Sequence, residues 1–430
     1  MSTWWARQGF VSLWVSRLLA YLGDQMVGIC MTVRVFRMLG TGAALGTFYV
    51  VRVLPSALLG PVIGVFIDAS DRRILAAAGL GLSSVFAVAL YYSGTVTPVL
   101  VFSFFAAVAS TVFGHSLRSL LPEVIEKDRL LNANSIQSGT ESAARLVAPA
   151  VSAALLAIAG TSGALLAAAC SYVLAAVAAL TIGGRPRRGE TGATASVFVQ
   201  PATSPGPRRG SSPAREFGLA AKATGRHLVE GLHYLVGQRT LLLVTLVVTL
   251  VMFADSSVSP LFTILLDKHL KVPPEFIGYL SSGYGAGLLI GAVAGPWLAK
   301  RVGEPGLVPA GALLIGIQML VYSSISVFWA ALPLQLVCGA GFALLMNGAI
   351  TAYQMVVPGR LIGRAISSSA AMGSMATVFA AKAGGAVADW KGVRAVFFGA
   401  GLVSLFATAC SLRLARERPG EVEGPGLISP

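Results

Sequence analysis

The sequence predicts an all-α integral membrane protein with twelve transmembrane helices, arranged as two pseudo-symmetric halves of six helices each. The chain of 430 residues is 55% hydrophobic and 12% charged, and its mean hydropathy is +0.76. Soluble domains carry about twice that charged fraction. Apolar segments of roughly 18 or more residues recur along the chain, and each is long enough to cross a hydrocarbon core of about 30 Å. Their continuous apolarity indicates helices, because the strands of a membrane barrel would alternate.

An internal repeat supports the division into halves. Asp24 and Asp255 lie in apolar segments 231 positions apart, and the pair Gly60 and Gly64 lies 231 positions before Gly291 and Gly295. The segment that begins at Arg129 resembles the segment that begins at Arg360 at the same offset. A shared offset across separate landmarks indicates a duplicated helical bundle, which is how many secondary transporters are built.

The expected spans follow in order along the chain. They cover residues 10–38, 43–67, 73–93, 98–120, 130–158 and 163–183, then 240–266, 276–299, 306–327, 329–354, 362–388 and 392–413. The first six correspond to the last six under the repeat. The N-terminal segment lacks the layout of a cleaved signal peptide, so we expect the first span to be retained.

The composition changes between the two halves. Residues 184–216 are rich in Gly, Pro, Arg, Ser and Thr, which predicts a disordered segment. Leu228, Leu232 and Leu235 then recur at helical spacing, which predicts an amphipathic helix on the membrane surface. We therefore expect five segments: an N-terminal bundle (1–184), a basic cytoplasmic linker (185–216), an interfacial helix (217–238), a C-terminal bundle (239–414) and a disordered tail (415–430).

The net charge of +14 reflects orientation in the membrane rather than nucleic-acid binding. Most of the 32 Lys and Arg residues fall in the loops and tails on one side of the predicted bundle. By the positive-inside rule, both termini lie in the cytoplasm, and the protein is a multi-pass protein of the plasma (cytoplasmic) membrane. The four cysteines all fall inside spans without ligand-like spacing, so we expect no metal site.

A charged loop joins the second and third spans. It contains Gly64, Asp68, Arg72 and Arg73. This pattern resembles the loop motif of the major facilitator superfamily, although Asp71 stands where that motif usually has Gly. The resemblance implies a gating role, in which Asp68 accepts hydrogen bonds from the start of the eleventh span and the arginines hold the loop at the anionic inner surface. The alternative is a loop whose charges only set topology.

Further segments resemble the drug:H⁺ antiporter branch of that superfamily, which includes macrolide and siderophore exporters. These segments are Phe10–Trp14 leading to Asp24, Leu121–Ser135, Arg145–Pro149, Gly231–Leu235 and Val357–Arg364. Ala148-Pro149 departs from the Gly-Pro that is common in the fifth span of such exporters. The resemblance implies multidrug-type efflux by a protein that is expected to be a monomer, with the proton gradient as its energy source and no cofactor.

Ionisable side chains inside the spans are candidates for proton coupling, since each costs several kcal/mol in the bilayer unless it meets a partner or water. They are Asp24, Glu141, Asp255, Arg17, Arg52, Arg145, Lys382 and His115. In one interpretation Asp24, Arg52, Glu141 and Arg145 form ion pairs that fix the register of the bundle. In the other, one acid takes up a proton during the cycle. Asp24 is then the first candidate, Glu141 the second and Asp255 the third, and His115 is a candidate relay.

These observations predict a secondary active transporter, a proton-coupled exporter of a hydrophobic or amphipathic small molecule that works by alternating access. By family resemblance, spans one, four, seven and ten line its cavity. Polar candidates for the cavity are Gln137, Tyr284, Asn347 and Gln354. No phosphate-binding loop or catalytic constellation is present, so we expect no enzyme. The alternatives are a lipid or lysolipid flippase, an importer of the same fold, and a non-transporting membrane scaffold or sensor.

Overall fold

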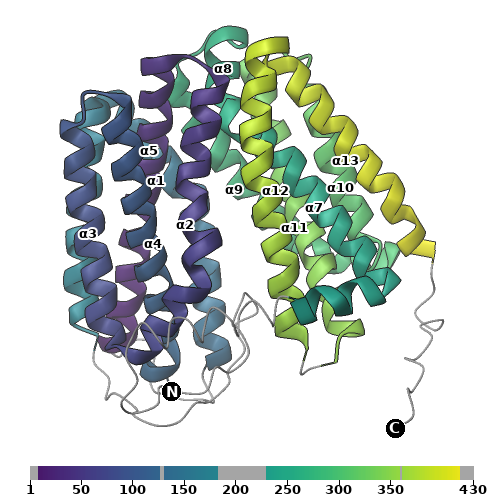
Figure 1. The fold of residues 1–430 in the computed structure, drawn as a ribbon, viewed down its shortest axis with the longest axis horizontal. Helices are drawn as coiled ribbons and strands as arrows, with labels where there is room; N and C mark the ends of the chain where they lie inside the picture. The colour runs from purple at the N-terminus through teal and green to yellow at the C-terminus, as the bar shows by residue number, and fades with distance from the viewer. Residues whose placement is uncertain (1–7, 126–129, 183–228, 359–360, 417–430) are drawn as a thin grey trace.

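The computed structural model describes residues 8–125, 130–182, 229–358 and 361–416, and within these ranges the regular structure is helical (Figure 1). The twelve expected spans are confirmed. The N-terminal half contains α1 (Gln8–Leu39), α2 (Gly42–Ala69), α3 (Arg72–Tyr92), α4 (Val96–Val124) and α5 (Leu130–Leu180). The C-terminal half contains α7 (Arg239–Val258), η3 (Ser259–Leu261), α8 (Phe262–Ile264), η4 (Leu265–His269), η5 (Pro274–Phe276), α9 (Ile277–Val302), α10 (Leu307–Tyr322), α11 (Phe328–Val356), α12 (Ile362–Lys391) and α13 (Val393–Arg416).

α5 holds two of the expected spans. Its two parts meet at Gly160, whose φ of 65° is not helical. A positive φ favours glycine, so this residue lets one span end and the next begin without an intervening loop. The predicted boundary between residues 158 and 163 therefore falls at the observed kink.

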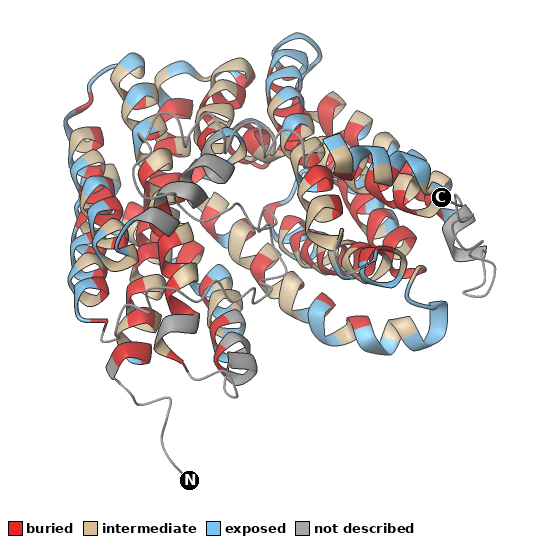
Figure 2. Cartoon of the chain, turned by 60° about the horizontal axis from the view of Figure 1, so that its bottom comes forward, coloured by how far each residue is buried: buried red, intermediate tan, exposed pale blue. Residues whose placement is uncertain are grey.

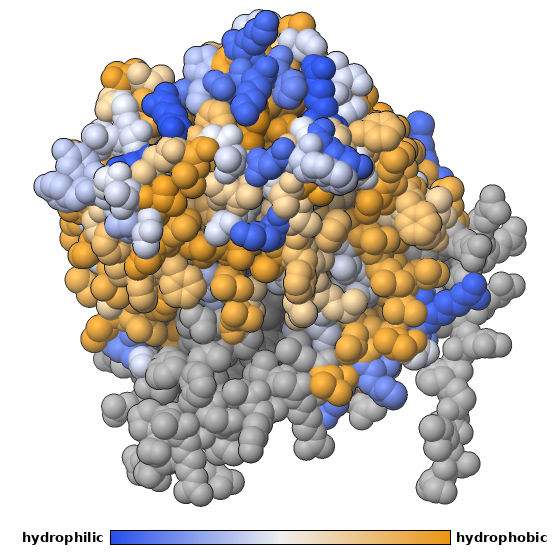
Figure 3. Space-filling model, turned by 45° about the horizontal axis from the view of Figure 1, so that its top comes forward, coloured by the Kyte–Doolittle hydropathy of each residue, from blue (hydrophilic) through white to orange (hydrophobic). Residues whose placement is uncertain are grey.

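The helices differ in how apolar they are. Eight of the described helical segments are long and apolar enough to cross a membrane on their own, and Gly42–Leu58 and Leu307–Tyr322 are shorter apolar helices. α12 is less apolar because it carries Lys382 and buried polar residues such as Ser368 and Thr377, and it packs against α2 and α7. Neighbouring helices thus shield its polar face from lipid. Figure 3 shows an apolar belt below a hydrophilic cap.

Two helix starts explain local features of the sequence. The Thr41 side chain accepts a hydrogen bond from the Ala44 amide at the start of α2. Asp71 caps α3 by accepting hydrogen bonds from the amides of Arg73 and Ile74. Acidic caps satisfy the unpaired amides and favour the positive end of the helix dipole. Asp71, which departs from the usual glycine of the loop motif, therefore has a structural role here.

The two halves stand side by side, with α1–α5 on one side and α7–α13 on the other (Figure 1). The described chain begins and ends on the same side of the molecule, here called the terminal side, which Figure 2 brings forward. The opposite side is called the far side. α2 packs against α12, and α5 packs against α9. These two pairs join the halves.

A short helix over residues 229–237 precedes α7. Val229, Leu232 and Val236 are exposed on it, while Leu235 is buried against the C-terminal half. This pattern agrees with the amphipathic character predicted for 217–238, but residues 217–228 lie outside the described part of the chain. The predicted linker 185–216 lies outside it too, as does most of the tail 415–430, and the domain boundaries stay predictions.

Candidate functional site

The halves meet closely at the far ends of α2 and α12. A Cβ on Gly42 would lie 2.6 Å from the Gly385 carbonyl oxygen, so the two backbones approach too closely for a side chain there. The Asp389 carboxylate, from α12, accepts hydrogen bonds from the amides of Gly42 (2.6 Å) and Ala43 (2.9 Å) at the start of α2. An acid of one half thus caps a helix of the other.

Two further polar contacts join the halves on the far side. Arg37 at the end of α1 forms an ion pair with Glu275 in η5. Lys382 donates a hydrogen bond of 2.6 Å to the Thr47 hydroxyl. Lys382, which the sequence presents as an intramembrane coupling candidate, is exposed and joins α12 to α2.

α5 and α9 also touch toward the far side. Gly278 lies against the Pro149 carbonyl and Ala153, and a Cβ on Gly285 would lie 2.5 Å from the Arg145 carbonyl oxygen. All of these contacts lie in the parts of α2, α5, α9 and α12 that are nearer the far side. This arrangement closes the interface between the halves at that end.

Asp24 lies inside the N-terminal half and is held by hydroxyl groups. Tyr172 Oη donates a hydrogen bond of 2.6 Å to one carboxylate oxygen, and Ser110 Oγ donates one of 2.8 Å to the other. Arg52 is near enough to attract the carboxylate electrostatically, and its guanidinium contacts the chain at Gly28. Among the described residues Asp24 forms no direct ion pair. Protonation of Asp24 would therefore break no salt bridge.

Asp255, the repeat partner of Asp24, lies in α7 of the other half. Ser259 Oγ donates to its carboxylate over 3.3 Å. Tyr49 of α2 lies near Ser256 and Ser259 and interacts electrostatically with both Asp255 and Arg52. Polar groups thus lead from Asp24 through Arg52 and Tyr49 to Ser259 and Asp255, and this path crosses between the halves.

Glu141 forms an ion pair with Arg17 of α1. The spacing of Glu141 and Arg145 allowed a pair along one face of the helix, but the structure gives Glu141 a partner on another helix. Of the set in the first interpretation, Glu141 thus forms an ion pair between helices, with Arg17 as its partner, and Asp24 is attracted by Arg52 from a distance. Next to the pair of Glu141 and Arg17, Trp14 donates a hydrogen bond of 2.7 Å to Thr140.

Arg118 of α4 and Arg145 of α5 are two further basic residues of the N-terminal half. The structure places Arg118 within α4, which continues to Val124. The two guanidinium groups repel each other electrostatically, and Arg118 also repels Arg17 and His115. The Arg145 guanidinium lies 6.0 Å from the centre of the Tyr21 ring of α1. Both arginines are exposed.

The remaining predicted residues are spread over the structure. Tyr284 of α9 interacts electrostatically with Asp255 and Arg145 and lies 6.1 Å from the Phe342 ring, so it belongs to the central region. Gln137 is buried in α5, whereas Asn347 and Gln354 are exposed on α11. The side chains of Gly64 and Asp68 lie outside the description, although both are residues of α2. Arg72 donates a hydrogen bond of 3.2 Å to the Ser119 carbonyl.

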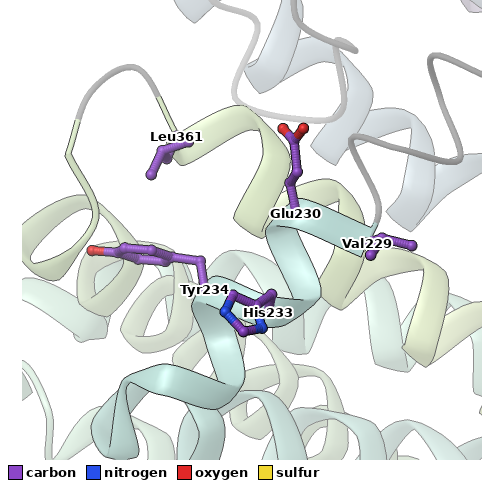
Figure 4. Close-up of a pocket in the computed structure, with 5 residues that line it drawn as sticks. All are labelled: Val229, Glu230, His233, Tyr234 and Leu361. Atoms are coloured by element: carbon purple, nitrogen blue, oxygen red, sulfur yellow. The ribbon is translucent and has the colours of Figure 1, made fainter.

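A shallow pocket of about 430 Å³ lies at the helix of residues 229–237 (Figure 4). Val229, Glu230, His233, Tyr234 and Leu361 line it. Glu230 also forms an ion pair of 2.5 Å with Arg364. Every lining residue belongs to one half, so movement between the halves would not open or close this pocket. We do not assign it to the transported molecule.

Several contacts of the site cannot be read from the sequence. Tyr172, Ser110 and Tyr49 are ordinary polar residues of apolar helices, and nothing in their spacing connects them with an acid. Among these contact residues, only Asp389 and Glu275 could have been suspected from the sequence, because each is an acid close to the end of a span. Their partners lie hundreds of positions away along the chain.

The chain resembles known proteins along most of its length. Residues 13–253 and 244–427 each match the family model described as Major Facilitator Superfamily. Macrolide efflux protein A of Streptococcus pyogenes is 22% identical over 320 residues, which cover 73% of this chain and 72% of that protein. The uncharacterized MFS-type transporter YfiS of Bacillus subtilis is 23% identical over 405 residues, 91% and 89% of the two chains.

Solved structures share the fold. The bacterial homolog of the human lysosomal transporter Spinster, in an inward-facing and unoccupied conformation, aligns with a TM-score of 0.72 at 13% identity. The alignment covers 97% of this chain and 98% of that one.

Proposed function

This chain belongs to the Major Facilitator Superfamily, and we propose that it exports a hydrophobic or amphipathic small molecule in exchange for protons. It is a multi-pass membrane transporter built from two six-helix halves. Export, proton coupling and the class of substrate are the proposal. The similarity to macrolide efflux protein A supports export of amphipathic compounds.

The position of Asp24 carries the proposal of proton coupling. A proton carrier has to be stable in both protonation states, because it is loaded on one side and emptied on the other. The charged form of Asp24 accepts hydrogen bonds from Tyr172 and Ser110, and Arg52 attracts it from a distance. The neutral form leaves no directly bonded cation without its partner. Glu141 is a weaker candidate, since its protonation would leave Arg17 unpaired.

The far-side contacts support alternating access. α2 with α12 and α5 with α9 close the interface at one end. We infer that the terminal side is the route to the centre. The positive-inside rule predicts that the terminal side lies in the cytoplasm, and an interface closed at the far side would then be inward-facing. Rocking of the halves would separate the far ends and expose the centre to the outside.

The experiment is proton release from acid-loaded proteoliposomes, followed with a pH-sensitive dye after addition of erythromycin, ethidium or a hydroxamate siderophore. The native chain is compared with Asp24→Asn, which keeps the shape and one acceptor oxygen. Asp267→Asn is the matched control, because Asp267 is an exposed acid outside the site.

We expect substrate-triggered proton movement in the native chain and the control, and its loss in Asp24→Asn. Movement that survives in Asp24→Asn would shift the coupling site to Asp255 or Glu141. If no compound moves protons in the native chain, the antiport proposal is wrong, and translocation of lipid becomes the leading alternative.

A further inference from the structure

The inner region of the N-terminal half holds more positive than negative charge. Four arginines of this half interact with each other or with its acids: Arg17 of α1, Arg52 of α2, Arg118 of α4 and Arg145 of α5. Arg17 has Glu141 as its ion-pair partner, and Arg52 is attracted by Asp24. Of the acids inside the spans of this half, Glu141 is paired with Arg17, and Asp24 lies within electrostatic reach of Arg52 without a direct ion pair.

In the part of the chain that the structure describes, neither Arg118 nor Arg145 has a hydrogen bond or an ion pair with a carboxylate. They repel each other, and Arg118 also repels Arg17. Asp255 accepts its hydrogen bond from Ser259 and not from either arginine, and its charge acts on Tyr49, Tyr284 and Cys338. Two guanidinium groups that repel each other and have no carboxylate partner among the described residues are costly in a membrane protein.

The surroundings place these arginines between the two halves rather than against lipid. Arg145 faces the Tyr21 ring of α1 and acts electrostatically on Tyr284, which α9 of the other half contributes. Arg118 is electrostatically coupled to Arg145 and to Arg17. Arg145 thus lies where α1 and α5 of one half meet α9 of the other, and both arginine side chains are exposed, so a ligand can reach them.

We propose that Arg118 and Arg145 bind a negatively charged group, a carboxylate or a phosphate, of the transported molecule. The inference rests on the proposed transport function and narrows its substrate to an amphipathic anion. Guanidinium groups match both anions with paired hydrogen bonds. The rings of Tyr21, Tyr284 and Phe342 supply aromatic surface beside the charges for an apolar body. An anion bound between Arg118 and Arg145 would offset the repulsion between their two guanidinium groups.

The test compares anions with neutral molecules of the same shape. The full-length protein is placed in nanodiscs of phosphatidylcholine, and calorimetry measures the binding of 1-naphthaleneacetate against 1-naphthaleneacetamide and of naphthyl phosphate against naphthol. We expect at least one anion to bind about tenfold more tightly than its neutral partner. Hydrogen bonds to charged groups are worth that factor or more.

The variants Arg118→Gln and Arg145→Gln should each weaken binding of the anion about tenfold and leave binding of the neutral partner unchanged. Arg301→Gln is the matched control, because Arg301 stacks on Trp297, 4.0 Å from the ring centre and away from the site. The melting temperatures of the two site variants should equal or exceed that of the native protein, since an uncompensated charge is removed. A marked loss of stability would indicate a structural ion pair and contradict the proposal.

An anionic lipid headgroup has the same chemistry as a soluble anion. Nanodiscs with added phosphatidylglycerol separate the two sources. The comparison uses the variant that carries both Arg118→Gln and Arg145→Gln. If this lipid weakens binding of naphthaleneacetate to the native protein but not to that double variant, the headgroup also occupies the site. If it has no effect, the site takes soluble anions only. Both results support the anion site.

The inference and the proposed function fail separately. If no anion binds more tightly than its neutral partner, the anion site is wrong whatever the proton assay shows. Proton movement driven by 1-naphthaleneacetate that the variant with both Arg118→Gln and Arg145→Gln retains in full would likewise overturn the site and leave antiport intact. Anion binding without any proton movement would preserve the site and reject antiport.

Discussion

The far-side bond between Asp389 and α2 should bias the protein toward the arrangement in which the far side is closed. Asp389 accepts hydrogen bonds of 2.6 and 2.9 Å from the amides of Gly42 and Ala43. Loss of a capping side chain costs typically about 1 kcal/mol. Because Asp389 caps a helix of the opposite half, this free energy is lost only when the far side opens. Asp389→Ala should therefore raise the ratio of open to closed molecules about fivefold.

The measurement is the distance between spin labels at Leu39 and Trp390, two exposed far-side positions on α1 and α12, in a chain whose native cysteines are replaced by serine. We expect a larger long-distance population in Asp389→Ala. Thr41→Ala is the control, since Thr41 caps the same helix start from within its own half. It should lower stability slightly without changing the distances. Unchanged distances in Asp389→Ala, or equal changes in both variants, would refute the reasoning.

Three other changes test the packing, the ion pair and the linker. Gly385→Ala should also favour far-side opening, because its Cβ would lie 2.8 Å from the Gly42 carbonyl carbon. Gly399→Ala is the control: its Cβ would have no neighbour within 4 Å, so the same spin-label distances should stay unchanged. Arg17→Gln and Glu141→Gln should each destabilise the protein by about 1–3 kcal/mol, less than a fully buried pair because the side chains are 15% and 34% exposed. In thermal unfolding, the variant with both Arg17→Gln and Glu141→Gln should lose less stability than the sum of the two single losses. Losses that simply add would argue against the ion pair. Deletion of 190–214 should leave transport in proteoliposomes intact, whereas its abolition would favour the scaffold alternative.

The architecture was accessible from the sequence because membrane helices are selected by composition and length. Continuous apolar segments gave the spans, and the shared offset of Asp24 and Asp255 gave the two halves. The break at Gly160 also fell where the predicted spans end. These signals are local or periodic, so a single chain carries them in full.

The partners of the charged residues were not accessible. Spacing alone permits Glu141 to pair with Arg145 one turn away, but packing of α1 against α5 brings Arg17 to it instead. Tyr172 and Ser110 reach Asp24 from α5 and α4, which the order of residues does not reveal. A pair along one helix is worth only about 0.2–0.5 kcal/mol, so contacts between helices readily override it.

The pair α2 and α12 suggests how the two ends of the transporter are coupled. The helices run in opposite directions between the terminal and far sides, so the C-terminal end of each lies beside the N-terminal end of the other. On the far side, Asp389 near the end of α12 caps the start of α2. The loop motif predicts the same relation on the terminal side, with Asp68 near the end of α2 and the start of α12 as its partner.

Each bond requires the two helices to meet at its own end. If the halves rock as rigid bodies, closing one end separates the other, and the two acids cannot both be satisfied. The Asp389 bond would then stabilise the arrangement closed at the far side, and the Asp68 bond the arrangement closed at the terminal side. Because the two contributions are of similar size, the free energies of the two arrangements stay within a few kcal/mol of each other. A transporter needs this near-equality, because the modest free energy of proton and substrate binding must be enough to move it in either direction. Asp68→Asn should accordingly shift the spin-label distances toward the closed far side, opposite to Asp389→Ala, and a shift in the same direction would exclude this competition.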